Sequence, residues 1–163
     1  MSETEKSTRP APRAFDRAVK LLATRAHFRE ELRQKLLRKG HANEEVEDAL
    51  ARLAALGQLD DAKLATEEAG RLRARKGLAR RGVAAELRRK GAAGEAIDGA
   101  LAEPADEAAL ALDAAHRWMR SHRRDPAALA RHLDRKGYGR GEIVRVLREL
   151  ELEDDAAALG DDA

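Results

Sequence analysis

The sequence predicts an all-α protein built from three tandem three-helix repeats. Ala, Leu, Arg, Glu and Lys dominate the composition, and no stretch alternates between apolar and polar residues as a strand would. The segment Leu-x-x-Lys-Gly recurs three times, ending at Gly40, Gly91 and Gly137, at intervals of 51 and 46 residues. Apolar residues recur four and eight positions before each glycine and six and ten positions after it. Each copy therefore predicts two helices joined at a glycine, and the interval leaves room for a third helix.

The first repeat, residues 14–57, follows a polar segment, residues 1–13, that we expect to be disordered. Its helices are expected over 14–25, 28–39 and 43–56. Lys-Gly suits the end of a helix, because the cation favours the C-terminal dipole and glycine adopts the left-handed turn. Asn43 is expected to cap the third helix, with Leu56 on its inward face.

The second repeat, residues 58–104, starts within the connector Gly57-Gln58-Leu59-Asp60-Asp61. Leu59 is expected to be buried, and Asp60 or Asp61 to cap the helix that ends at Gly77. The next helix ends at Gly91, and a weaker helix holding Ile97 closes before Pro104.

The third repeat, residues 105–152, begins with a helix capped by Asp106 that runs through Met119. Asp125-Pro126 predicts the start of the next helix, since proline is favoured at the first helical position. Gly137 ends that helix, and a last helix reaches Leu150. Residues 153–163 are expected to form an acidic disordered tail.

The net charge of +2 hides an uneven distribution. Residues 149–163 hold seven acidic and no basic residues, which leaves 32 basic against 23 acidic residues, or +9, for the rest of the chain. Between Arg71 and Lys90 nine basic residues face one acid, Glu86. This imbalance indicates an acidic or polyanionic partner, although a solvated helix face explains it equally well. We also expect the acidic tail to compete for the basic residues, so that deleting 153–163 tightens partner binding at low salt.

No pattern of catalytic, cofactor-binding or metal-binding residues is present. The chain lacks cysteine, and no two of its five histidines lie three or four residues apart, so we interpret them as surface or helix-end residues. Asp60-Asp61 fits a helix cap better than an acid–base pair, and no phosphate-binding loop or nucleophile motif occurs. Trp118 and Tyr138 fit core positions better than base-stacking positions. Three fused copies favour a continuous surface over a single DNA-reading helix.

Several segments together resemble the RecX family of bacterial RecA regulators. The similarity covers roughly residues 16–150 and includes the first helix, with Arg17-Ala18-Val19. The Gly57–Asp61 connector resembles the family's most recognisable signature. Further similar segments are Glu31–Leu36, Arg75-Lys76-Gly77, Glu86–Gly91 and Arg135–Tyr138. The chain departs from the family pattern at Phe28, at Leu64 and at Leu78-Ala79-Arg80, where an aromatic-Gly-Pro turn is usual.

The resemblance implies a non-enzymatic modulator that binds the RecA recombinase, occupies the groove of its nucleoprotein filament, and suppresses ATP hydrolysis and strand exchange. The repeats would form an elongated, curved, solenoid-like array of either hand, and the basic face would meet RecA or the DNA phosphate backbone. The alternative is a basic helical DNA-binding module without a recombinase partner. In either case the expected contact residues are Arg71, Arg73, Arg75, Lys76, Arg80, Arg81, Arg88, Arg89, Lys90, Arg120, Arg123, Arg124 and Arg135.

The remaining expectations concern location and assembly. No apolar run approaches the length of about 20 residues that a membrane span needs. The N-terminus lacks the apolar core of a signal peptide. We therefore expect a cytoplasmic protein that does not enter the membrane and acts as a monomer, without a cofactor.

Overall fold

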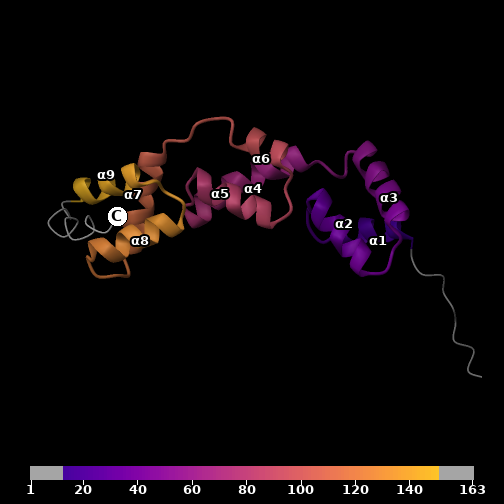
Figure 1. Ribbon diagram of the computed structural model, residues 1–163, viewed down its shortest axis with the longest axis horizontal. Coiled ribbons are helices and arrows are strands. Elements are labelled where there is room, and N and C mark those ends of the chain that lie inside the picture. The colour runs from indigo at the N-terminus through magenta and orange to yellow at the C-terminus, as the bar shows by residue number, and fades with distance from the viewer. Residues whose placement is uncertain (1–12, 151–163) are drawn as a thin grey trace, which may run out of the picture. The chain divides into compact units, whose positions relative to one another are not determined.

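The computed structural model describes residues 13–150. The segments expected to be disordered, 1–13 and 153–163, lie outside the described residues except for Arg13, which directly precedes the first helix. The described residues form helices and no strands (Figure 1), and the predicted all-α class is confirmed. None of these helices is long and apolar enough to cross a membrane. In chain order the helices are α1 (Ala14–Leu22), α2 (Arg29–Arg38), α3 (Asn43–Ala55), α4 (Asp61–Lys76), α5 (Arg80–Arg89), α6 (Gly94–Ala100), α7 (Glu107–Met119), α8 (Pro126–Arg135) and α9 (Arg140–Glu149).

The described residues divide into two compact units, the first ending at Asp61 and the second beginning at Ala62. The first unit holds α1, α2 and α3, which pack against one another around a core that includes Leu32, Leu36 and Leu50. In the second unit α7, α8 and α9 pack around Leu129, Leu133 and Tyr138, and α5 packs against α6. The boundaries of the three repeats within this arrangement remain a prediction.

The three Lys-Gly segments end their helices in the same way. Gly40, Gly91 and Gly137 have φ values of +88°, +91° and +93°, in the left-handed region that glycine adopts without strain. After each glycine the next amide donates to the carbonyl of the leucine four residues before that glycine, at 3.4, 3.0 and 3.2 Å. This pattern is the Schellman motif, and it confirms the helix ends that the repeat predicts.

Carboxylates from elsewhere in the fold cap α2 and α5, which lack a capping residue of their own. The first amide of α2, on Arg29, donates to Asp61 at 2.9 Å, and the first amide of α5, on Arg80, donates to Glu107 at 3.1 Å. Arg29 and Arg80 lie 51 residues apart and Asp61 and Glu107 lie 46 apart, the same intervals that separate the glycines. At the third equivalent position stands Pro126, which has no amide hydrogen to satisfy.

Several local predictions need correction. Of the two residues expected to cap α4, Asp60 or Asp61, Asp61 is the first residue of that helix and its carboxylate accepts from α2, which leaves Asp60 as the predicted cap. Asn43 is the first residue of α3 and not its cap, and its side-chain oxygen accepts from Arg33 at 2.8 Å. Leu56 lies beyond the end of α3 and is 63 % exposed, while helix α1 stops at Leu22, three residues early. The caps Asp106 and Asp125, each accepting the amide three residues ahead, are confirmed.

Inside the second unit, the loop between α4 and α5 packs directly on the turn between α8 and α9. The Tyr138 hydroxyl donates to the carbonyl of Gly77 at 3.0 Å, and the amide of Ala79 donates to the carbonyl of Lys136 at 3.1 Å. Tyr138 is fully buried, which confirms its core position. The backbone of Gly82 also approaches this turn so closely that a Cβ there would lie 2.2 Å from the Lys136 carbonyl oxygen. We call this contact the loop–turn junction.

Candidate functional site

All thirteen basic residues predicted to bind a partner lie in the second unit, but the structure divides them into two groups. The first group makes side-chain hydrogen bonds or ion pairs with other described residues and comprises Arg71, Lys76, Arg80, Arg81, Arg89 and Lys90. The second group has no such contact within residues 13–150 and comprises Arg73, Arg75, Arg88, Arg120, Arg123, Arg124 and Arg135. The sequence alone did not separate the two groups.

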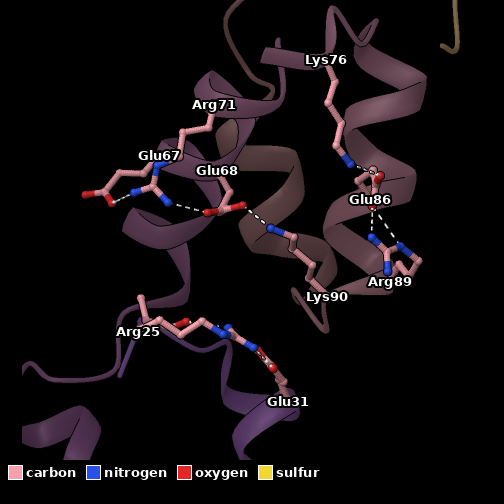
Figure 2. Close-up of polar contacts among 10 residues, drawn as sticks. Arg25, Glu31, Glu67, Glu68, Arg71, Lys76, Glu86, Arg89 and Lys90 are labelled. Carbon is pink, nitrogen blue, oxygen red and sulfur yellow. Dashed lines mark hydrogen bonds and ion pairs between the residues drawn. The ribbon is translucent and has the colours of Figure 1, made fainter. Parts of the chain in front are cut away.

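Two glutamates neutralise much of the basic stretch on α4 and α5. Figure 2 shows Glu68 between Arg71 and Lys90, and a second cluster centred on Glu86. Burial raises the pKa of Glu68, but the hydrogen bonds and charges of Lys90 and Arg71 outweigh burial and hold that pKa below its usual range. Glu68 is therefore ionised at neutral pH, and the charge it carries reduces the positive potential of this surface.

Glu86 of α5 pairs in the same way with Lys76, at the end of α4, and with Arg89. Its carboxylate accepts from Lys76 at 2.8 Å and from Arg89 Nε at 2.9 Å (Figure 2). Hydrogen bonds from Lys76 and then Arg89 lower the pKa of Glu86. Because Lys76 ends α4 while Glu68 lies at its middle, the pairs Lys76–Glu86 and Glu68–Lys90 show that α5 runs antiparallel to α4.

Arg80 and Arg81 already make contacts within the second unit. The guanidinium of Arg80 donates to the carbonyl of Leu101. The guanidinium of Arg81 lies 3.1 Å from Asp134 and 3.3 Å from the carbonyl of Tyr138. Both arginines thus tie α5 to neighbouring parts of the second unit.

Arg75 and Arg88 are the exposed, uncompensated cations of α4 and α5. Each lies in the last turn of its helix, where the helix dipole favours a cation. Neither has an ion pair among the residues that the structure describes. Arg73 differs, because its Nε is buried and has no hydrogen-bond acceptor within the described chain. Arg75 and Arg88 are therefore the positions where an acidic group of a partner would meet an unshared positive charge.

A second basic group lies on the connection between α7 and α8. Arg120, Arg123 and Arg124 are exposed there, and Trp118 is half-buried beside them with the ring of His122 stacked on its indole. Arg135 ends α8. Among the described residues no group of three metal-ligating side chains comes together, and the sequence pattern likewise contains none.

The sequence analysis did not predict the ion pairs that glutamates form with the basic stretch, and only some of these pairs have a local sequence signal. Glu67 and Glu68 precede Arg71 by four and three residues, a spacing that predicts ion pairs on one helix face. The pairing of Glu68 with Lys90 spans 22 residues and depends on how α4 and α5 pack. No local pattern indicates such a contact.

Comparison with known proteins places this arrangement in a family. Residues 14–53 match the model described as RecX, first three-helix domain. Over 147 residues the chain is 37 % identical to the regulatory protein RecX of Pelodictyon phaeoclathratiforme, covering 87 % of this chain and 91 % of that protein. The chain belongs to the RecX family. The regulatory protein RecX of Chlorobaculum tepidum is 34 % identical over 161 residues, covering 96 % of both chains.

Solved RecX structures share the fold. The crystal structure of RecX from Lactobacillus salivarius superimposes with a TM-score of 0.71, at 18 % identity, over 85 % of this chain and 95 % of that one. A crystal structure of regulatory protein RecX gives the same TM-score at 23 % identity, over 82 % of this chain and 70 % of that one. In this RecX family member the departure at Leu78-Ala79-Arg80 lies at the loop–turn junction, where Leu78 and Ala79 are buried.

Proposed function

We propose that this protein regulates the RecA recombinase by binding the RecA–DNA filament, without catalysing a reaction, and that binding suppresses ATP hydrolysis and strand exchange. Membership of a family of regulatory proteins supports this function. The structural observation that carries the proposed contact is the pair of exposed arginines, Arg75 and Arg88, that lack acidic partners in the described chain.

Arg75 and Arg88 are better placed to bind an acidic group of a partner than the ion-paired residues beside them. Arg89 and Lys90 already interact with Glu86 and Glu68, so a partner's carboxylate or phosphate would have to compete for them. An unshared guanidinium binds a carboxylate or a phosphate through two parallel hydrogen bonds without giving up an existing interaction. Arg75 and Arg88 thus contribute more to partner binding than the ion-paired residues beside them.

Many weak contacts give the proposed interaction its affinity. A filament presents the same RecA surface at regular intervals, and a repeat protein presents similar helices in succession. Contacts to successive subunits reinforce one another, because after the first contact the others form at high effective concentration. Exposed cations make this binding sensitive to salt.

The test is binding of the protein to filaments of the cognate RecA on single-stranded DNA, measured by co-sedimentation. We expect Arg75→Glu with Arg88→Glu to weaken binding at least about tenfold, since two charge-assisted contacts become repulsive. The matched control is Arg38→Glu with Lys39→Glu, the same charge change at the exposed end of α2 in the first unit. The control should bind as the wild type does.

Two results would contradict the proposal. Equal binding by the double variant and the wild type would remove Arg75 and Arg88 from the contact. Binding to DNA that is the same with and without RecA would support the DNA-binding module instead. Reversing Arg88, Arg89 and Lys90 together is a weaker test, because it places glutamates beside Glu86 and Glu68 and can unfold the region.

A further inference from the structure

The connection between α7 and α8 carries a flat, fixed and exposed ring. The imidazole of His122 stacks on the indole of Trp118 with ring centroids 4.4 Å apart and planes 9° apart. Its Nδ1 lies 2.8 Å from the carbonyl oxygen of Trp118, which only accepts, so Nδ1 carries the hydrogen and donates it. Ser121 Oγ lies 3.0 Å from the same nitrogen. The orientation of the His122 ring is therefore set by its own helix end.

The face of His122 that points away from Trp118 is open to a ligand. His122 is an exposed residue, and among the described residues its only ring contact is with Trp118. Trp118 has a second ring neighbour, His132, whose centroid lies 5.8 Å away at an angle of 37°. The three rings form a small cluster, and His122 is its exposed member.

Exposed arginines flank His122 in the sequence. Arg120, Arg123 and Arg124 are exposed and have no hydrogen bond or ion pair within residues 13–150. The one acid of the connection, Asp125, uses its carboxylate to accept the amide of Ala128 at 2.9 Å. Burial lowers the pKa of His132, and the nearby cations Lys136 and Arg135, together with His122, lower it further, as expected where positive charge accumulates.

We propose that this connection binds single-stranded nucleic acid, with one base stacked on the free face of His122 and neighbouring phosphates held by Arg123 and Arg124. An aromatic platform among cations is the arrangement that holds unpaired bases, because each base offers a flat face and each phosphate a negative charge. An acidic peptide would use the arginines but not the ring. The proposed site uses residues other than Arg75 and Arg88, and it requires no recombinase partner.

The chain itself supplies the probe. Trp118 is the only tryptophan in the sequence and lies in the proposed site, so its fluorescence reports base stacking directly. We would titrate the protein, without RecA, with a thymidine oligonucleotide and with an abasic oligonucleotide of equal length and charge. The thymidine oligonucleotide should change Trp118 fluorescence saturably and bind at least about tenfold more tightly than the abasic one, the usual contribution of one stacked base.

Variants separate stacking from charge. His122→Ala should abolish the preference for bases over the abasic oligonucleotide, and His122→Phe should restore it by replacing one flat ring with another. Arg123→Gln with Arg124→Gln should weaken both oligonucleotides equally and reduce the salt slope by about 1.4, at about 0.7 per phosphate contact on a single strand. Arg38→Gln with Lys39→Gln, on the first unit, should change neither.

Clear results would overturn the inference. Equal affinity of the wild type for the abasic and the thymidine oligonucleotides would show that no base stacks here. A preference for bases that persists in His122→Ala would place the platform elsewhere. Polyglutamate of the same length binding as tightly as the oligonucleotide would identify a surface for acidic protein. Because RecA is absent from this assay, its failure leaves the proposed regulation of RecA untouched.

Discussion

Gly82→Ala should destabilise the second unit, although the same substitution normally stabilises a helix. Gly82 lies in the first turn of α5, where alanine is favoured over glycine by about 0.5–1 kcal/mol. A Cβ at this position would lie 2.2 Å from the carbonyl oxygen of Lys136, whereas real Cβ contacts are essentially never shorter than 3.0 Å. Backbone faces backbone at this contact, so no side chain can rotate away to relieve the clash.

The magnitude follows from the loop–turn junction. The two backbones must separate by about 0.8 Å to reach the shortest normal contact. Forcing an extra methyl into a packed site costs about 1–3 kcal/mol, and losing the hydrogen bond from Ala79 to Lys136 costs about 1 kcal/mol more. After the helical gain of alanine, the free energy of unfolding should fall by about 1.5–3 kcal/mol.

The assay is urea unfolding followed by Trp118 fluorescence, which reports on the second unit alone. With a slope of about 2 kcal/mol per molar urea, the Gly82→Ala midpoint should fall by about 1 M. Gly70→Ala in α4 is the matched control, since nothing lies within 4 Å of its Cβ position, and its midpoint should rise. A Gly82→Ala variant as stable as Gly70→Ala would refute the description of the junction.

Two further predictions concern buried polar groups. Tyr138→Phe removes the donor to the Gly77 carbonyl while keeping the ring, so the unfolding free energy of the second unit should fall by about 1–3 kcal/mol in the same urea assay; an unchanged midpoint would show that this hydrogen bond contributes nothing. His27, expected at the surface or at a helix end, lies just before α2 and is only 3 % exposed, and burial lowers its pKa despite the opposing effect of its hydrogen bond to the Arg25 carbonyl. Its Nε2 accepts from Lys35 at 2.8 Å, which requires the neutral ring. Since the unfolded chain binds the proton more tightly, stability should be complete above the unfolded pKa of about 6.5 and should fall as the pH drops below it. His27→Gln should reduce that loss between pH 6.5 and 5, measured by circular dichroism, leaving the part due to His132, whose pKa burial also lowers. An identical pH dependence in the variant and the wild type would count against this assignment.

The pH range over which stability is lost also distinguishes the effect of His27 from that of the neighbouring Glu31. Glu31 lies 2.9 Å from Lys35 and forms a two-pronged contact with Arg25 (Figure 2). Burial raises the pKa of Glu31, but its hydrogen bonds to Arg25 and Lys35 outweigh burial, and the pKa is lowered. The stability that Glu31 contributes is therefore present above its unfolded pKa and is lost only at more acidic pH, below the window used for His27.

Much of the fold could be predicted because its signals are local. The Lys-Gly helix ends and the Asp125-Pro126 helix start each depend on a few neighbouring residues, and the structure confirms them. The capping of α2 by Asp61 could not be predicted, because the donor and acceptor are separated by 32 residues. The equivalent cap of α5, in which the Arg80 amide donates to Glu107, can be recognised as a feature of the repeat only after the contact between Arg29 and Asp61 is known.

The ion pairs of the candidate site were even harder to predict from the sequence than the helix caps. Composition located the basic stretch on α4 and α5, but it could not show that Lys90 reaches Glu68 or that Arg81 reaches Asp134, 53 residues away. Pairing of this kind depends on helix packing, and it decides which charges remain for a partner. The stacking between Trp118 and His122 could be predicted only in part. A spacing of four residues permits the contact, but the orientation of the rings depends on how α7 ends.

The most direct test of the central claim is ATP hydrolysis by the cognate RecA on single-stranded DNA, with this protein titrated in at physiological salt. We expect dose-dependent inhibition by the wild type and by the Arg38→Glu, Lys39→Glu control. We also expect that the Arg75→Glu, Arg88→Glu variant needs at least about tenfold more protein for the same inhibition. Inhibition well below one copy per RecA would indicate capping of filament growth, and inhibition near one copy per few subunits would indicate occupancy of the groove. Unchanged ATP hydrolysis at saturating wild-type protein would contradict the claim that this chain regulates RecA.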